Sequence, residues 1–170
     1  ANVHNFNGRW KTVDIVAKDR SLEFMSEFSS LTDMQVFQNI QDFLPDDRIL
    51  HLANSSVVRY AQLFDPLPGV RYESNRGTSG IDGSTSTAIG AAVASEKETV
   101  FITGDLSFLY DSNALLNNYI PFNFKIIVIN NGGGGMGAGS LQQNIWINVI
   151  VTRNDGLTSF YKNSQLTGSQ

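Results

Sequence analysis

Residues 99–105 read Thr-Val-Phe-Ile-Thr-Gly-Asp, and residues 125–131 read Lys-Ile-Ile-Val-Ile-Asn-Asn. Each stretch is a short apolar run that ends on a side chain bearing oxygen, Asp105 in the first and Asn131 in the second. Continuous β-branched runs of this length are typical of strands buried on both faces, as in parallel sheets. Four glycines, Gly132 to Gly135, follow the second run. The pair predicts two parallel strands whose carboxyl ends carry hard oxygen ligands beside a glycine-rich turn, an arrangement suited to Mg²⁺ and a diphosphate.

Strands and helices alternate through the middle of the chain around these two runs. The predicted strands are 48–53, 70–74, 99–103 and 124–129, and the predicted helices are 32–44, 55–64, 84–95 and 105–118. This alternation predicts an α/β domain of three layers, αβα, with a mostly parallel sheet. Ligands of such sheets lie beyond the carboxyl ends of the strands. Four polar residues fall there: Ser55, Asn75, Asp105 and Asn131.

The two ends of the chain show weaker patterns. Residues 1–30 have little periodicity, and we expect a lead-in or linker with little regular structure. Residues 31–152 are expected to form the α/β domain, with 145–152 as its last strand. The remainder, 153–170, is an uncertain tail, for which we expect a short helix over 157–165 and no structure in the last five residues.

Composition excludes several classes of function. The chain has 170 residues, a net charge of −4 with scattered basic residues, and no cysteine. It therefore lacks the concentrated positive face of a nucleic-acid-binding protein, as well as disulfides and thiolate metal sites. No apolar run approaches the roughly 18 residues of a membrane span, and the first residues lack the layout of a signal peptide. We expect a cytoplasmic protein that binds neither nucleic acid nor membrane.

The residues that carry chemistry each have a second interpretation. Asp105 and Asn131, with a backbone carbonyl of the glycine run, would supply oxygen ligands to Mg²⁺, but Asp105 could instead only cap its helix. Glycines after a buried strand let the backbone approach a phosphate, although a glycine run can also be a linker. The run is not a Walker loop, because no Gly-Lys-Ser/Thr follows it.

Three further residues have roles that the pattern leaves open. Arg59 and Arg76 are candidates for binding an anionic substrate, because guanidinium matches carboxylate in a bidentate manner. The alternative for each is a surface ion pair. Ile81 is apolar within a polar loop and is either a small core plug or a wedge beneath a cofactor.

Three segments resemble a known family. They are Asn54-Ser55-Ser56-Val57-Val58-Arg59, then the run from Ser74 to Gly83 (Ser-Asn-Arg-Gly-Thr-Ser-Gly-Ile-Asp-Gly), then the run from Gly104 to Asp111 (Gly-Asp-Leu-Ser-Phe-Leu-Tyr-Asp). They are similar to the 2-succinyl-5-enolpyruvyl-6-hydroxy-3-cyclohexene-1-carboxylate synthases of menaquinone biosynthesis, a family of thiamine-diphosphate enzymes. The Gly104-Asp105 pair followed by Asn130-Asn131 resembles the cofactor motif of such enzymes in general. Leu106, at a position where many thiamine-diphosphate enzymes have glycine, favours resemblance to these synthases in particular.

The resemblance implies the domain that binds the diphosphate of thiamine diphosphate together with Mg²⁺ or Mn²⁺. It assigns the metal to Asp105, Asn131 and the Gly133 carbonyl, and the substrate carboxylate to Arg59 and Arg76. It assigns the cofactor to Ser55, Ile81, Gly104, Leu106 and Ser107, with Ile81 as the wedge that bends it. The implied enzyme is a transferase that decarboxylates 2-oxoglutarate and adds the resulting unit to isochorismate.

The resemblance also sets the alternatives. Enzymes of this family are several times longer, and their activating glutamate lies in a domain absent from these residues, so we expect no turnover from this chain alone. Their cofactor lies between subunits, so we expect a homo-oligomer. The chain could instead belong to another thiamine-diphosphate decarboxylase or carboligase, or serve as a non-catalytic assembly module.

Overall fold

The computed structural model describes residues 4–27, 32–44, 46–130, 149–154, 157–162 and 165–169. The contacts between residues divide the chain into two units, Ala1–Asp42 and Phe43–Gln170, and each is described by itself.

The first unit contains a long helix that the sequence does not predict. Helix α1 spans His4–Ser26, where we expected little structure. Its large apolar side chains, such as Phe6 and Trp10, are exposed. Local contacts hold it instead, including an ion pair of 3.0 Å between Lys18 and Asp14 one turn apart. Apolar residues recur at helical spacing when one face of a helix is buried. Most of α1 is exposed, so its sequence gives little such signal.

The second helix of this unit begins with the predicted capping box. Helix α2 spans Asp33–Phe43. The Gln35 N–H donates to the Thr32 hydroxyl at 3.3 Å, and the Thr32 N–H donates to the Gln35 side-chain oxygen at 2.9 Å. Two end N–H groups are thereby satisfied, as the sequence predicts.

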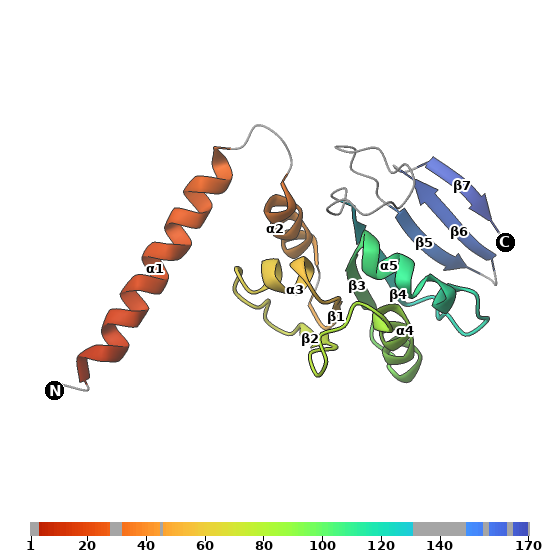
Figure 1. Cartoon of the computed structure of the whole chain (residues 1–170), viewed down its shortest axis with the longest axis horizontal. Coiled ribbons are helices and arrows are strands. Elements are labelled where there is room, and N and C mark those ends of the chain that lie inside the picture. The colour runs from red at the N-terminus through yellow and green to blue at the C-terminus, as the bar shows by residue number, and fades with distance from the viewer. Residues whose placement is uncertain are drawn as a thin grey trace. The chain divides into compact units, whose positions relative to one another are not determined.

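The second unit contains the predicted parallel sheet (Figure 1). Its elements are β1 Ile49–Leu52, α3 Ser56–Ala61, β2 Arg71–Ser74, α4 Ser84–Ala94, β3 Thr99–Gly104, α5 Asp105–Tyr110, the 3₁₀ helix Ser112–Leu115 and β4 Phe124–Ile129. The four strands are parallel and lie in the order β2-β1-β3-β4. The expected α/β class is confirmed. The helix expected over 105–118 is wrong in its second half, because α5 ends at Tyr110 and a 3₁₀ turn follows.

Helices cover both faces of this sheet. Successive side chains of a strand point to opposite faces. In β1, His51 lines a pocket with Thr87 of α4, whereas its neighbour Leu52 lines a different pocket with Val58 of α3. Helix α4 therefore lies on one face and α3 on the other, which gives the three layers that the sequence predicts.

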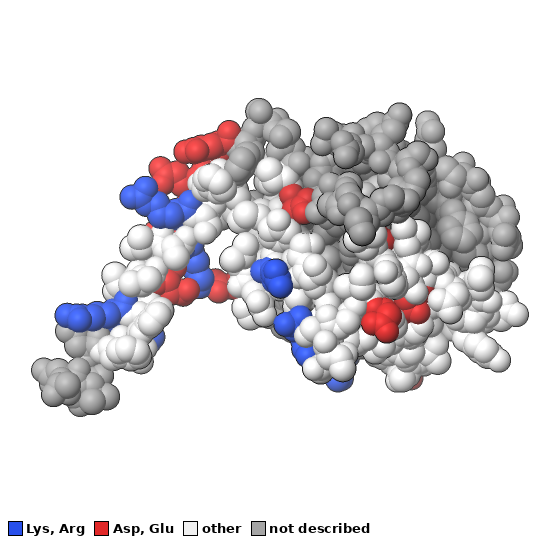
Figure 2. All heavy atoms as spheres, viewed as in Figure 1, with Lys and Arg blue, Asp and Glu red and all other residues white. Residues whose placement is uncertain are grey.

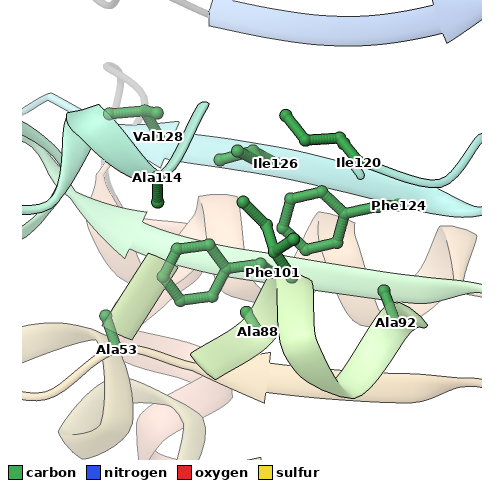
Figure 3. Packing of buried hydrophobic residues seen from close by; sticks show 10 residues of the cluster. Ala53, Ala88, Ala92, Phe101, Ala114, Ile120, Phe124, Ile126 and Val128 are labelled. Atoms are coloured by element: carbon green, nitrogen blue, oxygen red, sulfur yellow. The ribbon is translucent and has the colours of Figure 1, made fainter. Parts of the chain in front are cut away.

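The core of the unit lies between α4 and strands β3 and β4 (Figure 3). Phe101 of β3 is fully buried, and its ring stacks with that of Phe124 at a centroid distance of 6.5 Å. The small Ala88 and Ala92 of α4 face this layer and are also buried. Small residues on the helix leave room for large aromatic rings on the sheet, which fixes α4 close to β3.

The tail differs from expectation. Strands β5 Val149–Asn154, β6 Leu157–Lys162 and β7 Gln165–Ser169 form a separate antiparallel sheet in that order. The helix expected over 157–165 and the absence of structure expected in the last five residues are therefore both wrong. Only Asp155 and Gly156 separate the paired residues Asn154 and Leu157, and Asp-Gly is typical of two-residue hairpin turns. Our sequence interpretation took this signal as the end of a strand.

Candidate functional site

The carboxyl ends of the four strands meet at one edge of the sheet, because the strands are parallel and in register. From β1 the chain crosses to β2 on one side, and from β3 it crosses to β4 on the other side. The loops after β1 and β3 therefore diverge at a topological switch point, where open α/β sheets bind ligands. Ser55 follows β1, and Asp105 follows β3, so the sheet brings these two predicted site residues into adjacent loops.

Ser55 has an unusual backbone conformation at this point. Its φ is 72° and its ψ is −132°, a combination that serine rarely adopts. Such a conformation costs about 1–3 kcal/mol and persists where the surrounding structure imposes it. Ser55 precedes α3, yet its side chain makes no capping bond, and the residue is exposed. Its hydroxyl therefore remains available to a ligand at the switch point.

Asp105 is half-buried at the first position of α5. The capping position belongs to Gly104, and no side-chain capping bond is made there. Within the described part of the chain, no hydrogen bond or ion pair to the Asp105 carboxylate is found. The interpretation of Asp105 as only a helix cap therefore has no support in this structure. Its carboxylate is available to a cation.

Gly104 leaves open space beside Asp105. Its φ of −81° is accessible to any residue, and a Cβ built on it would meet no atom within 4 Å among the described residues. Neither backbone conformation nor packing within those residues requires glycine here. The room suits a group that approaches the backbone closely, such as a phosphate.

Two of the three proposed metal ligands cannot be placed. Asn131 and Gly133, with the rest of the glycine run, lie outside the described residues. Among the residues that are described, no three His, Cys, Asp or Glu side chains gather as a metal site by themselves. The Asp105 carboxylate, the Ser55 hydroxyl and the space at Gly104 are nevertheless of the kind that a diphosphate with a divalent cation requires.

The loop that carries Arg76 and Ile81 is held by neutral side chains. Asn54 is buried and donates to the carbonyls of Asn75 and Gly80, both at 2.7 Å. Its side-chain oxygen accepts a hydrogen bond of 2.9 Å from Nη1 of Arg76. Our sequence interpretation gave Asn54 no role beyond the start of a helix.

Ile81 is half-buried and is held from the β3 side of the switch point. The hydroxyl of Ser107 donates to its carbonyl at 2.8 Å. Ser107 is buried, so its side chain acts here as a support for the loop. Leu106, next to it, is exposed.

The two arginines differ in their surroundings. Arg76 lines a pocket of about 540 Å³ together with Leu52 and Tyr72. This pocket does not include Ser55 or Asp105, so it lies on the α3 side rather than at the switch point. Arg59 lies in the last turn of α3, exposed and with no ion pair among the described residues. Figure 2 shows charged side chains scattered in small groups over one face of the molecule.

Asp111 is a second structural residue that sequence reasoning missed. It is buried, and its two carboxylate oxygens accept from the N–H and the hydroxyl of Ser86 at 2.6 and 2.7 Å. A carboxylate from after α5 thus caps the first turn of α4. Nothing in the local sequence around Asp111 signals this contact, since its partner lies 25 residues earlier.

Comparison with known families agrees with this geometry. The model of the family described as "Thiamine pyrophosphate enzyme, C-terminal TPP binding domain" matches residues 55–170. The chain belongs to this family. The match begins at Ser55 and includes the tail that our resemblance left out. The fold and the cofactor class, thiamine diphosphate, that the sequence resemblance implied are confirmed.

Individual relatives show which members of this family the chain is similar to. The chain is 57% identical over 119 residues to the 2-succinyl-5-enolpyruvyl-6-hydroxy-3-cyclohexene-1-carboxylate synthase of Flavobacterium johnsoniae, which covers 70% of this chain and 21% of the relative. It is 64% identical over 105 residues to that of Flavobacterium psychrophilum (62% and 19%) and 43% identical over 133 residues to that of Porphyromonas gingivalis (78% and 23%). The resemblance to these synthases is confirmed, and the chain spans about a fifth of their length. None of the helices within the described residues combines the length and apolar character needed to cross a bilayer.

Proposed function

We propose that this chain is the diphosphate-binding and metal-binding domain of a thiamine-diphosphate-dependent synthase of menaquinone biosynthesis. The observation that carries the proposal is the switch point of the sheet. The loop after β3 has open space at Gly104 and carries Asp105, whose carboxylate has no partner among the described residues, and the adjacent loop after β1 ends at Ser55. When bound, thiamine diphosphate supplies a thiazolium carbon on which a 2-oxo acid loses CO₂. The residues of this chain bind and orient it.

The metal would be held by Asp105, Asn131 and the Gly133 carbonyl. A carboxylate and two neutral oxygens, completed by phosphate oxygens, make the octahedral oxygen shell that Mg²⁺ prefers, and Mn²⁺ would fit the same set. Asp105 supports this role because its carboxylate has no other partner among the described residues.

The cofactor would contact both loops of the switch point. Ser55 and the turn from Gly104 to Ser107 would bind the diphosphate through hydroxyl and backbone N–H groups. Ile81 would lie beneath the cofactor as a wedge. Its loop is held from both sides, by Asn54 and by Ser107, which supports a fixed position for this side chain.

The substrates of the whole enzyme would be 2-oxoglutarate and isochorismate, with Arg59 and Arg76 binding carboxylate. The exposure of both arginines supports this assignment. The relatives are about five times longer than the matched segment, so the activating residues would come from outside this chain, and a homo-oligomer would complete the cofactor site.

The experiment is a calorimetric titration of thiamine diphosphate into the chain with Mg²⁺, repeated with EDTA. We expect binding that requires the metal and is lost on chelation. Binding that is equally strong in EDTA would contradict the metal assignment. Because the other half of the cofactor pocket is expected outside this chain, the same titration on a chimera, with the matching segment of the Flavobacterium johnsoniae synthase replaced by this chain, provides the decisive arm. Absence of binding there would refute the proposal.

Two other functions are separated by the same chimera. A decarboxylase or carboligase of different substrate class would turn over pyruvate in preference to 2-oxoglutarate, whereas the proposed synthase prefers 2-oxoglutarate. An assembly module would fold and associate with no affinity for thiamine diphosphate. The similarity to the Flavobacterium synthases favours the synthase.

A further inference from the structure

The loop Asn75–Gly83 connects β2 to α4 and carries both Arg76 and Ile81. It has no helix or strand of its own and includes Gly77, Gly80 and Gly83. A loop without a ladder of backbone bonds opens readily unless other groups hold it. Its position at the carboxyl edge therefore depends on the side chains that bind its backbone.

Asn54 supplies three of those contacts from a single buried side chain. A carboxamide has two N–H donors and one oxygen acceptor. Here both N–H groups donate to carbonyls five residues apart, those of Asn75 and Gly80. The oxygen accepts from Arg76, which lies between them. With only 2% of its surface exposed, Asn54 makes these bonds shielded from competing water, so they are stronger than on the surface.

The contact with Asn54 also decides which edge of Arg76 faces outward. The guanidinium donates to Asn54 through Nη1, and no other hydrogen bond from this group is found among the described residues. A carboxylate binds guanidinium through two parallel N–H bonds. With one N–H of Nη1 engaged, the edge formed by Nε and Nη2 is the one on which neither nitrogen has a partner among the described residues, and it is the edge we assign to a carboxylate.

We infer that Asn54 is a positioning residue, which closes the loop over residues 75–80 and turns the Nε/Nη2 edge of Arg76 toward a substrate carboxylate. The step toward substrate rests on the proposed function. The closing of the loop rests only on the three hydrogen bonds and the burial of Asn54.

The loop has an independent support near each of its ends. Ser107 holds the Ile81 carbonyl at 2.8 Å, and the Asn75 side chain donates to Thr87 of α4 at 3.0 Å. Loss of the Asn54 amide should therefore release residues 76–80 while Ile81 stays near its place. This selectivity separates a positioning role from a general loss of stability.

The first measurement is amide hydrogen exchange in the 170-residue chain. Asn54→Leu keeps a similar volume and removes all three bonds, whereas Asn54→Asp keeps an oxygen for Arg76 and removes both donors. For both variants we expect exchange of the Arg76 amide, whose N–H donates to the Ser74 carbonyl at 2.9 Å, to rise at least about tenfold, with the amides of β3 unchanged. The Asn54→Asp variant keeps the measurement possible if Asn54→Leu does not fold. Unchanged exchange in the loop of a folded variant would overturn the inference.

The second measurement reads Arg76 directly. The Nε–H resonance of Arg76 is followed while 2-oxoglutarate, as the carboxylate probe, is titrated into chains that keep Arg76. The affinity itself is measured by calorimetry in all variants, because the Arg76→Gln background lacks this resonance. Asn54→Leu should weaken the apparent affinity at least about tenfold in the parent chain but less than about twofold in an Arg76→Gln background. A purely structural role of Asn54 predicts the same factor in both backgrounds, and that result would overturn positioning.

The two proposals fail in different ways. No response of Arg76 to 2-oxoglutarate in the parent chain would overturn its orientation toward a carboxylate. Loss of the proposed function is recognised separately, as an absence of thiamine diphosphate binding by the chimera with Asn54 intact.

Discussion

The two edges of the parallel sheet treat charge in opposite ways. At the amino edge, charges pair with each other: Glu98 forms ion pairs with Arg48 and, at 2.5 Å, with Lys125, and Lys97 pairs with Asp47. These residues precede or begin three of the four strands.

The carboxyl edge is held together by neutral groups. Asn54 and Ser107 tie its loops through amide and hydroxyl bonds, while Asp105 and Arg59 have no ion pair among the described residues. The amino edge thus neutralises its own charges, whereas the proposed binding edge leaves Asp105 and Arg59 for ligands of opposite charge.

The largest expected effect separates the two edges by one substitution at each. Asp105→Ala should weaken the Mg²⁺-dependent binding of thiamine diphosphate by at least about 100-fold, roughly 2.7 kcal/mol, because the proposed metal site would lose its only carboxylate. Asp47→Ala at the amino edge is the control and should change affinity by less than about twofold. Calorimetry on the binding-competent chimera measures the affinity of both variants for thiamine diphosphate. Equal affinities would contradict the proposed difference between the two edges.

The next effect tests the carboxylate that is used structurally beside the binding edge. Asp111→Ala should lower the free energy of unfolding by about 1–2 kcal/mol, because the first turn of α4 loses its cap. Asp82→Ala, an exposed residue of the neighbouring loop, should change it by less than about 0.5 kcal/mol. Urea denaturation of the chain compares them, and similar midpoints would show that the Ser86 contact adds no stability.

A smaller loss is expected at the amino edge. Glu98→Gln removes the charge shared by Arg48 and Lys125, both of which remain partly exposed. We expect about 1 kcal/mol of destabilisation, which shrinks at high salt, and no change in cofactor affinity. Denaturation in low and high salt measures the loss of stability, and the calorimetric titration measures the cofactor affinity. A large change in affinity would mean that the amino edge also serves binding.

An effect of the opposite sign is expected at Ser55. Glycine tolerates its positive φ, so Ser55→Gly should raise the free energy of unfolding by up to about 1 kcal/mol. The same variant should weaken binding of thiamine diphosphate, because the hydroxyl is lost. Ser55→Ala keeps the strain and loses the hydroxyl, so it should weaken binding without stabilising. If Ser55→Gly is less stable than Ser55→Ala, the positive φ of Ser55 is not a source of strain.

His51 is buried in β1, between the two edges of the sheet. Burial lowers the pKa of His51, and the charge of Glu73 opposes this only in part. The folded chain therefore holds His51 neutral, and the unfolded chain takes up the proton first as pH falls below about 6.5. The free energy of unfolding should decrease from pH 7.5 to 5.5, with a smaller decrease in His51→Gln. Identical pH dependence of the parent chain and the His51→Gln variant would show that another group causes the loss of stability.

Local sequence predicts the strands and fails at the contacts that complete the site. β3 and β4 follow from continuous apolar runs, and the cap of α2 follows from two residues three apart. The Asn54 bonds join residues 21 to 26 positions apart, which no local pattern reveals. Helix α1 was missed because most of its large apolar side chains are exposed, which leaves little periodicity. The pairing of β5 with β6 was missed because a turn signal does not say whether the chain returns.

The strand order also constrains how the chain assembles in time. β1 is made first, and it pairs with β2, in which Ile49 meets Arg71. Its other side must wait for β3, where Ile49 meets Thr99. During synthesis from the amino end, one side of β1 therefore stays unpaired over some fifty residues of elongation. Such non-local pairing slows folding and leaves a strand edge open to other chains. Strand β1, which is buried along its whole length in the folded sheet, is thus open to pairing with other chains while the protein is being made.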